Sequence, residues 1–236
     1  MMKTDIDKYN EDLDSAEPLR AIDYFNSLFP GLCVFSTSLG AEDQFLTEII
    51  ATSFPSIRII TLDTGRLFQE SYDLIRITHQ KYNKPIEIYF PDHRSVEKMV
   101  NEKGINLFYD NVENRKECCN VRKIEPLRRA LHGTKVWITG LRREQSANRS
   151  GMRMVEWEER HSIIKLNPLI DFSADDIWSG IRVKKIPYNS LHDKGFPSIG
   201  CQPCTRAIFP DEDLRAGRWW WESGSKKECG LHNNEK

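Results

Sequence analysis

Long apolar runs are absent from the sequence. No window holds eighteen consecutive apolar residues, and Met1 to Asp7 contain no apolar core like that of a secretion signal. We therefore expect a cytoplasmic protein with no membrane contact. The net charge is also close to zero, because the 34 Lys and Arg residues nearly balance the 35 Asp and Glu residues. This balance argues against a nucleic-acid-binding protein, which needs a strongly basic face.

Cysteines are few, but they are grouped. The six comprise Cys33 in an apolar run, the adjacent Cys118 and Cys119, the Cys201-Gln-Pro-Cys204 tetrad, and Cys229 near the C-terminus. Structural disulfides are rare in the cytoplasm, so metal binding or redox chemistry is the better interpretation of the groups. Cys33 is expected to be a small buried hydrophobic residue.

Apolar strand segments alternate with amphipathic helical segments along the chain. The expected strands are 32–36, 57–62, 86–90, 135–139 and 163–166, and the expected helices are 19–28, 42–52, 66–82, 95–103, 121–131 (bent at Pro126) and one capped by Ser173. This order predicts an α/β fold with a mostly parallel twisted sheet and helices on both faces. We expect a polar lead-in over 1–18, a single α/β domain over 19–222 and a mobile tail over 223–236.

Ligands of such sheets bind beyond the carboxyl ends of the strands, where three loops carry suitable residues. The first contains Ser36, Thr37, Ser38 and Gly40, the second Asp63, Thr64 and Gly65, and the third Arg142 and Arg143. Hydroxyls and a glycine before a helix can hold an anion, and guanidinium groups suit phosphate or sulfate oxygens. Each loop alone could equally be a helix cap. Three at one sheet edge favour a nucleotide-like anion.

The two cysteine pairs suit a metal site. Zinc sites usually separate the cysteines of a pair by two to four residues, which Cys201 and Cys204 satisfy and Cys118 and Cys119 do not. Adjacent Cα atoms, about 3.8 Å apart, are also too close for an ordinary disulfide. Separate iron corners of a cluster can each take one thiolate. An iron–sulfur cluster is therefore favoured, and zinc stays open.

Cys229 lies among residues that favour its thiolate form. Lys226, Lys227 and His232 surround it, and cations lower the pKa of a neighbouring thiol. The alternative is an incidental surface cysteine. The preceding tryptophans, Trp219 to Trp221, are expected to pack against the body and anchor the tail.

In combination, these motifs resemble those of the assimilatory sulfonucleotide reductases, and specifically the iron–sulfur adenylyl-sulfate (APS) reductase branch. The resemblance covers roughly residues 20–232. It is carried by Ser-Thr-Ser-Leu-Gly-Ala-Glu-Asp, Leu-Asp-Thr-Gly, Cys-Cys-Asn-Val-Arg-Lys, Gly-Leu-Arg-Arg-Glu-Gln-Ser, Cys-Gln-Pro-Cys-Thr, Arg-Ala-Gly-Arg-Trp-Trp-Trp and Glu-Cys-Gly-Leu-His. It implies an adenine nucleotide α-hydrolase-like fold and a thioredoxin-dependent enzyme of sulfate assimilation and cysteine biosynthesis, which reduces APS to sulfite and AMP.

The resemblance also implies roles for individual residues. Cys229 would attack the sulfate sulfur and become an S-sulfocysteine, from which reduced thioredoxin releases sulfite. The metal ligands of a [4Fe–4S] cluster would be Cys118, Cys119, Cys201 and Cys204, and Lys123 would link cluster and substrate electrostatically. The phosphosulfate would be held by Arg142, Arg215, Arg218 and His232, and the adenosine by the loops Ser36–Gly40 and Asp63–Gly65.

Alternatives remain at the level of substrate and class. PAPS, which carries a 3′-phosphate, could replace APS or be used as well, although PAPS-specific relatives generally lack both cysteine pairs. An ATP pyrophosphatase would need the Ser-Gly-Gly-x-Asp-Ser loop, which is absent. A zinc-stabilised binding module would predict a dispensable tail. The sequence leaves open whether the chain forms a homo-oligomer.

Overall fold

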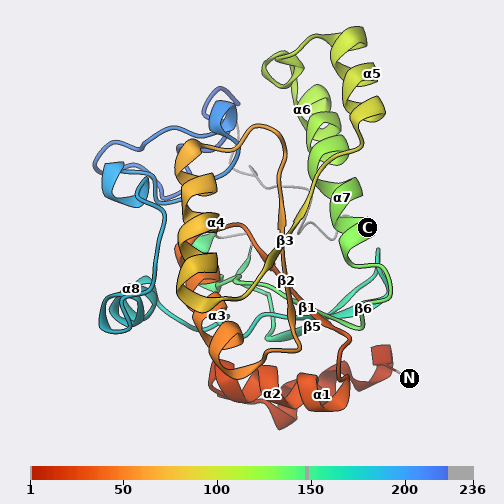
Figure 1. The fold of residues 1–236 in the computed structure, drawn as a ribbon, viewed down its shortest axis with the longest axis vertical. Helices are drawn as coiled ribbons and strands as arrows, with labels where there is room; N and C mark the ends of the chain where they lie inside the picture. The colour runs from red at the N-terminus through yellow and green to blue at the C-terminus, as the bar shows by residue number, and fades with distance from the viewer. Residues whose placement is uncertain (1, 147–148, 223–236) are drawn as a thin grey trace. The chain divides into compact units, whose positions relative to one another are not determined.

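The computed structural model describes residues 2–146 and 149–222, which form one six-stranded sheet with surrounding helices (Figure 1). The strands are β1 Cys33–Thr37, β2 Arg58–Leu62, β3 Ile86–Tyr89, β4 Val136–Ile138, β5 Val155–Glu158 and β6 Ile163–Leu166. The α-helices are α1 Ile6–Asp12, α2 Pro18–Leu28, α3 Ala41–Ser53, α4 Gln69–Tyr82, α5 His93–Lys103, α6 Val112–Cys119, α7 Glu125–Ala130 and α8 Ala174–Val183. Within this part of the chain, no helix is both long and apolar enough to cross a membrane.

The strand order is β3-β2-β1-β4-β6-β5, and the prediction of a mostly parallel α/β sheet is confirmed. Strand β1 pairs in parallel with β2 and β4, β4 pairs in parallel with β6, and only the β5–β6 pair is antiparallel among the pairings described. Because β1 and β4 are parallel neighbours with Phe35 opposite Ile138, the loops that follow them begin at the same sheet edge. Strand β5 was not predicted, because apolar and polar residues alternate over only four positions there.

The chain divides into two compact units. The first comprises the described residues of Met1–Thr61, Glu70–Glu87 and Gly133–Ser190, and the second those of Leu62–Gln69, Ile88–His132 and Leu191–Lys236. We expected one domain over 19–222. Because each unit is assembled from separate stretches, no linker or change of composition marks the division in the sequence.

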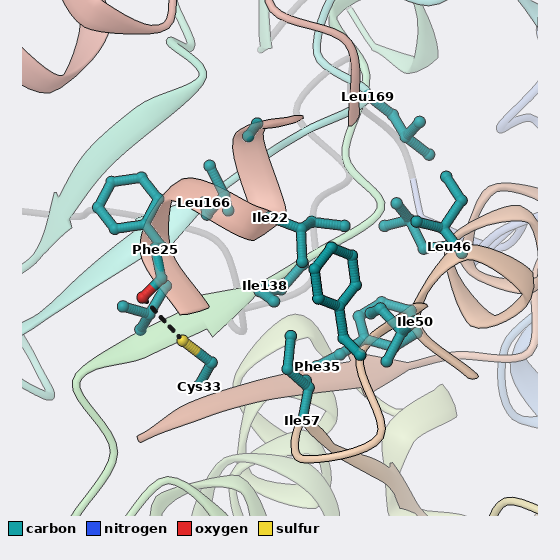
Figure 2. Packing of buried hydrophobic residues seen from close by; sticks show 14 of the residues in the cluster. Ile22, Phe25, Cys33, Phe35, Leu46, Ile50, Ile57, Ile138, Leu166 and Leu169 are labelled. Carbon is teal, nitrogen blue, oxygen red and sulfur yellow. Dashed lines mark hydrogen bonds between the residues drawn. The ribbon is translucent and has the colours of Figure 1, made fainter. Parts of the chain in front are cut away.

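The core of the first unit lies between one face of the sheet and four helices, as Figure 2 shows for its centre. Phe35, Ile138 and Leu166 come from the strands, and α1, α2, α3 and α8 supply the facing residues. The lead-in expected over 1–18 is part of this core. Tyr9 of α1 and Leu13 are 8% and 1% exposed, because apolar residues four apart give even a polar helix a buried side.

Cys33 is a core residue, as predicted. Its side chain is 1% exposed, and its Sγ lies 3.5 Å from the carbonyl oxygen of Phe25 (Figure 2). Burial raises the pKa of the Cys33 thiol to about 12, because the thiolate loses its hydration.

We expect Cys33 to resist alkylation in the native protein. At about pH 8 its reactive thiolate form is scarce and the sulfur is inaccessible to reagent. Peptide mapping after treatment with iodoacetamide, first native and then in denaturant, should find Cys33 modified only in denaturant. Rapid native modification would show that this core opens readily.

Candidate active site

The adjacent cysteines lie where a helix widens. Cys118 and Cys119 end α6, a π-helical turn follows over Asn120–Ile124, and α7 continues from Glu125. The sequence predicted instead one helix over 121–131 with a bend at Pro126. Pro126 lies in the first turn of α7, directly after the π-helical turn, so the irregularity precedes the proline. Such π-helical turns are frequent at functional sites.

The second cysteine pair is held by a short 3₁₀ turn, Gln202–Cys204. The Cys204 N–H donates to the Cys201 carbonyl at 2.9 Å, and the Gln202 N–H donates to the carbonyl of Arg66 at 2.8 Å. Thr64 Oγ1 lies 3.3 Å from Cys201 Sγ. The loop Asp63–Gly65, predicted to hold nucleotide, therefore also contacts the cysteines within the second unit.

All four paired cysteines line one cavity in the second unit. Each is 8–9% exposed. Four cationic side chains share the lining: Arg66, Arg115, Arg122 and Lys123. The structure thus brings together the four predicted ligands and Lys123, which the sequence separates by up to 86 residues (204 minus 118).

Burial raises the pKa values of these thiols, and the neighbouring cations lower them. Burial is the main cause that raises the pKa of Cys204 to about 12, and the neighbouring Cys201 adds to it, whereas Lys123 and Arg218 oppose the rise. Burial also raises the pKa of Cys118, against the effect of Arg122. A bound metal would displace the protons of such thiols, because only thiolates are ligands.

Within the described part of the chain, two residues of the cavity lining, Arg122 and Trp219, and Arg218 beside Trp219 carry unpaired donors. The buried Arg122 Nε, Arg218 Nε and Trp219 Nε1 have no hydrogen-bond partner among the described residues. Buried N–H groups without acceptors are costly, so their presence beside four thiols suits an anionic group. A thiolate-bound iron–sulfur cluster is such a group.

The spacing of the cysteines bears on zinc. In the described part of the chain, no three Cys, His, Asp or Glu side chains are grouped to hold one metal ion. Four thiolates on one tetrahedral zinc must come within roughly 3.8 Å of one another, given a Zn–S bond of about 2.3 Å. A cluster takes thiolates at separate irons, and the four paired cysteines of the lining are the residues that would hold either group.

Arg215 and Arg218 also belong to the second unit. Arg218 is buried, donates to the carbonyl of Ile199 at 3.2 Å and lies over the Trp219 ring at 4.9 Å. A Cβ at Gly200 would clash with its guanidinium group, so a larger residue there would displace the Arg218 side chain. Arg215 is half-buried, and its N–H donates to Asp213.

The first unit holds the remaining described candidates. Ser36 Oγ accepts a hydrogen bond of 2.8 Å from Trp137 Nε1, and Thr37 Oγ1 accepts one of 3.0 Å from the Leu39 N–H. Gly40 is the N-cap of α3. Arg142 is 4% exposed and already bound by Glu42 and Glu144, so an anion would have to share its guanidinium with two carboxylates.

The sequence did not single out Asp43, although Asp43 is the last residue of the motif Ser-Thr-Ser-Leu-Gly-Ala-Glu-Asp, which contains the first loop. Its carboxylate takes both donors of Ser38, the N–H and the hydroxyl, which were expected to face an anion. An Asp at the third position of a helix was the available signal. Cys229 and His232 lie outside the described residues.

Together, the fold and the cavity define an α/β protein with a cationic, thiol-lined site. Residues 32–207 match the family described as "Phosphoadenosine phosphosulfate reductase domain". Adenosine 5'-phosphosulfate reductase from Allochromatium vinosum is 52% identical over 86% of this chain and 79% of its own length. The chain belongs to the phosphoadenosine phosphosulfate reductase family.

Solved structures agree with this assignment. A crystal structure of phosphoadenylyl-sulfate (PAPS) reductase from Candida auris, in a phosphate complex, is similar at a TM-score of 0.74 and 28% identity, covering 86% of this chain and 96% of that one. Yeast FAD synthetase in complex with FAD is similar at a TM-score of 0.57 and 16% identity, covering 81% and 66%, and shows a shared fold alone.

Proposed function

We propose that this chain reduces APS to sulfite and AMP in sulfate assimilation. The observation that carries the proposal is the cavity that gathers both cysteine pairs with Lys123 in a chain 52% identical to a reductase named for this substrate. A further relative with that name, from Sinorhizobium fredii, is 50% identical over 86% of this chain. A cytoplasmic location, where thiols stay reduced, belongs to the proposal.

The reaction proceeds by two displacements at sulfur. The Cys229 thiolate attacks the sulfate sulfur of APS, an S–S bond forms, the bond from sulfur to the bridging oxygen breaks, and AMP leaves with that electron pair. One thiolate of reduced thioredoxin then attacks Cys229 Sγ and expels sulfite. Its second thiol resolves the mixed disulfide, so thioredoxin is oxidised and the Cys229 thiol is restored.

Fixed cations are the main requirement of the first displacement. Thiolate and sulfate are both anionic, so Arg215, Arg218, His232 and Arg142 are proposed to hold the phosphosulfate and offset the repulsion. Cys118, Cys119, Cys201 and Cys204 would hold a [4Fe–4S] cluster, which would supply structural support and fixed charge beside the substrate. Lys123, on the lining of the same cavity, would act between the cysteines and the substrate.

The loops that follow β1 and β2 are proposed to hold the adenosine end. Ser36, Thr37, Ser38 and Gly40 belong to the first unit and Asp63, Thr64 and Gly65 to the second. The Gly65 N–H donates to Asp63 Oδ1 at 2.7 Å, which shapes the second loop into a turn.

PAPS is the second candidate substrate. It is favoured by the similarity to the Candida auris PAPS reductase, whereas the relatives at about 50% identity are named for APS. The 3′-phosphate that distinguishes the two nucleotides would lie at the adenosine end.

Incubation with APS or PAPS without thioredoxin, followed by intact mass spectrometry, tests nucleophile and nucleotide together. We expect one sulfonate adduct from APS and little from PAPS, because only the first displacement can occur. Thioredoxin should then remove the adduct and release sulfite. An adduct from PAPS alone would reverse the substrate assignment, and no adduct from either would contradict the mechanism.

A further inference from the structure

Asp43 joins two loops of the first unit. It lies in the first turn of α3 and is 8% exposed. Its Oδ2 accepts hydrogen bonds from Ser38 N at 2.5 Å and Ser38 Oγ at 2.6 Å, and the backbone of Gly140 packs against its Oδ1. Ser38 follows β1, and Gly140 follows β4. One buried carboxylate therefore connects the two neighbouring strand-end loops.

The fit at Gly140 is tight. A Cβ on this residue would lie far inside van der Waals contact with Asp43 Oδ1. Only glycine therefore lets the backbone of the loop that follows β4 pack this closely against the carboxylate.

Glu42 extends the same connection. Its Oε1 accepts hydrogen bonds from Arg142 Nε at 3.0 Å and Nη2 at 2.8 Å. Two consecutive carboxylates at the start of α3 thus contact the loop that follows β4. Asp43 contacts its backbone at Gly140, and Glu42 binds its Arg142 side chain.

Helix capping alone does not account for the burial of Asp43. At α8, Asp176 also accepts from the N–H and the hydroxyl of one serine, Ser173 N at 2.8 Å and Ser173 Oγ at 2.6 Å, but Ser173 is the N-cap and Asp176 is exposed. Hydrogen bonds from Ser173 lower the pKa of Asp176, whereas burial raises that of Asp43 to about 6. Such a serine–aspartate pair can thus form in solvent, and the burial of Asp43 brings its carboxylate into contact with Gly140.

We propose that Asp43 is a positioning residue that locks the loop of Ser36–Gly40 to the loop of Thr139–Arg142, so that the two present one preformed surface to the nucleotide. This rests on the proposed function, since the surface is expected to bind APS. Loops fixed before binding lose less conformational entropy when the substrate arrives, so the lock should increase affinity.

The test compares Asp43→Asn with Asp176→Asn, both in a Cys229→Ser background so that bound APS does not react. An asparagine keeps the shape but loses the charge, and its single amide oxygen is a weaker acceptor for the N–H and the hydroxyl of Ser38. Loss of one charged hydrogen-bonding group is worth roughly tenfold or more in an equilibrium constant. We expect Asp43→Asn to weaken APS binding about tenfold and Asp176→Asn, which loses only a cap, to leave it unchanged.

The rate of adduct formation, measured in proteins that keep Cys229, distinguishes a positioning role of Asp43 from a general loss of structure. At saturating APS, Asp43→Asn should form the sulfonate adduct at nearly the parental rate, because affinity is lost rather than reactivity. If folding fails, Gly140→Ala gives a second approach, since its methyl group displaces the same carboxylate and should weaken binding similarly. Unchanged affinity in either folded variant contradicts the lock. Failure of the parent protein to bind APS contradicts the proposed function instead.

Discussion

Replacing Cys229 with serine is expected to stop sulfite formation while APS still binds. A serine hydroxyl is almost entirely protonated at neutral pH and is a far weaker nucleophile than a thiolate. Lys226, Lys227 and His232 are expected to favour the thiolate at this position, and they cannot ionise a serine to a useful extent. We expect turnover to fall by roughly a thousandfold or more, as when other covalent nucleophiles are removed.

Intact mass after incubation with APS measures the effect directly. The parent protein should gain a sulfonate on Cys229 and the Cys229→Ser variant none. Cys33→Ala is the matched control, because it removes a cysteine from the core and should still form the adduct. A sulfonate on the Cys229→Ser protein would require another nucleophile.

Replacing Cys118 with serine is expected to remove the visible absorption of the protein. Cys118 is 9% exposed and lines the cavity with the other three paired cysteines, so its loss leaves a cluster with one thiolate too few. Purified parent protein should be brown and contain iron and sulfide. Cys118→Ser should be colourless and depleted of both.

The same preparations distinguish the metals. Cys33→Ala should keep its colour and iron content, because Cys33 belongs to the hydrophobic core of the first unit. Colourless parent protein with stoichiometric zinc would contradict the cluster. The readouts are absorption and metal content, so they do not depend on the activity of the enzyme.

The sequence predicted features that a local pattern determines. The apolar run that contains Phe35 predicted β1, and Ser173 with Asp176 predicted the start of α8, where both hydrogen bonds of the capping box are present. The two cysteine pairs likewise indicated a common metal site from the sequence alone. In each case the signal lies in residues close together in the chain.

Features that depend on distant residues were not predictable in this way. By local pattern Asp43 is an ordinary acidic residue in the first turn of α3, and only the approach of Gly140, 97 residues later (140 minus 43), gives it a contact with a second loop. The pairing of Arg142 with Glu42 is equally non-local. The roles of Cys229, His232, Arg215 and Arg218 remain predictions.

The number of residues between the cysteines and the cations matters at this site. Arg122 and Lys123 follow Cys118 and Cys119 by four residues each, about one helical turn, so the two pairs can lie on one side of the helix. All four side chains line the same cavity. Deletion of one residue between Cys119 and Arg122 would rotate both cations by about 100° relative to the sulfur atoms without changing any of these side chains. Evolution at this point is therefore constrained in the count of residues as well as in their identity.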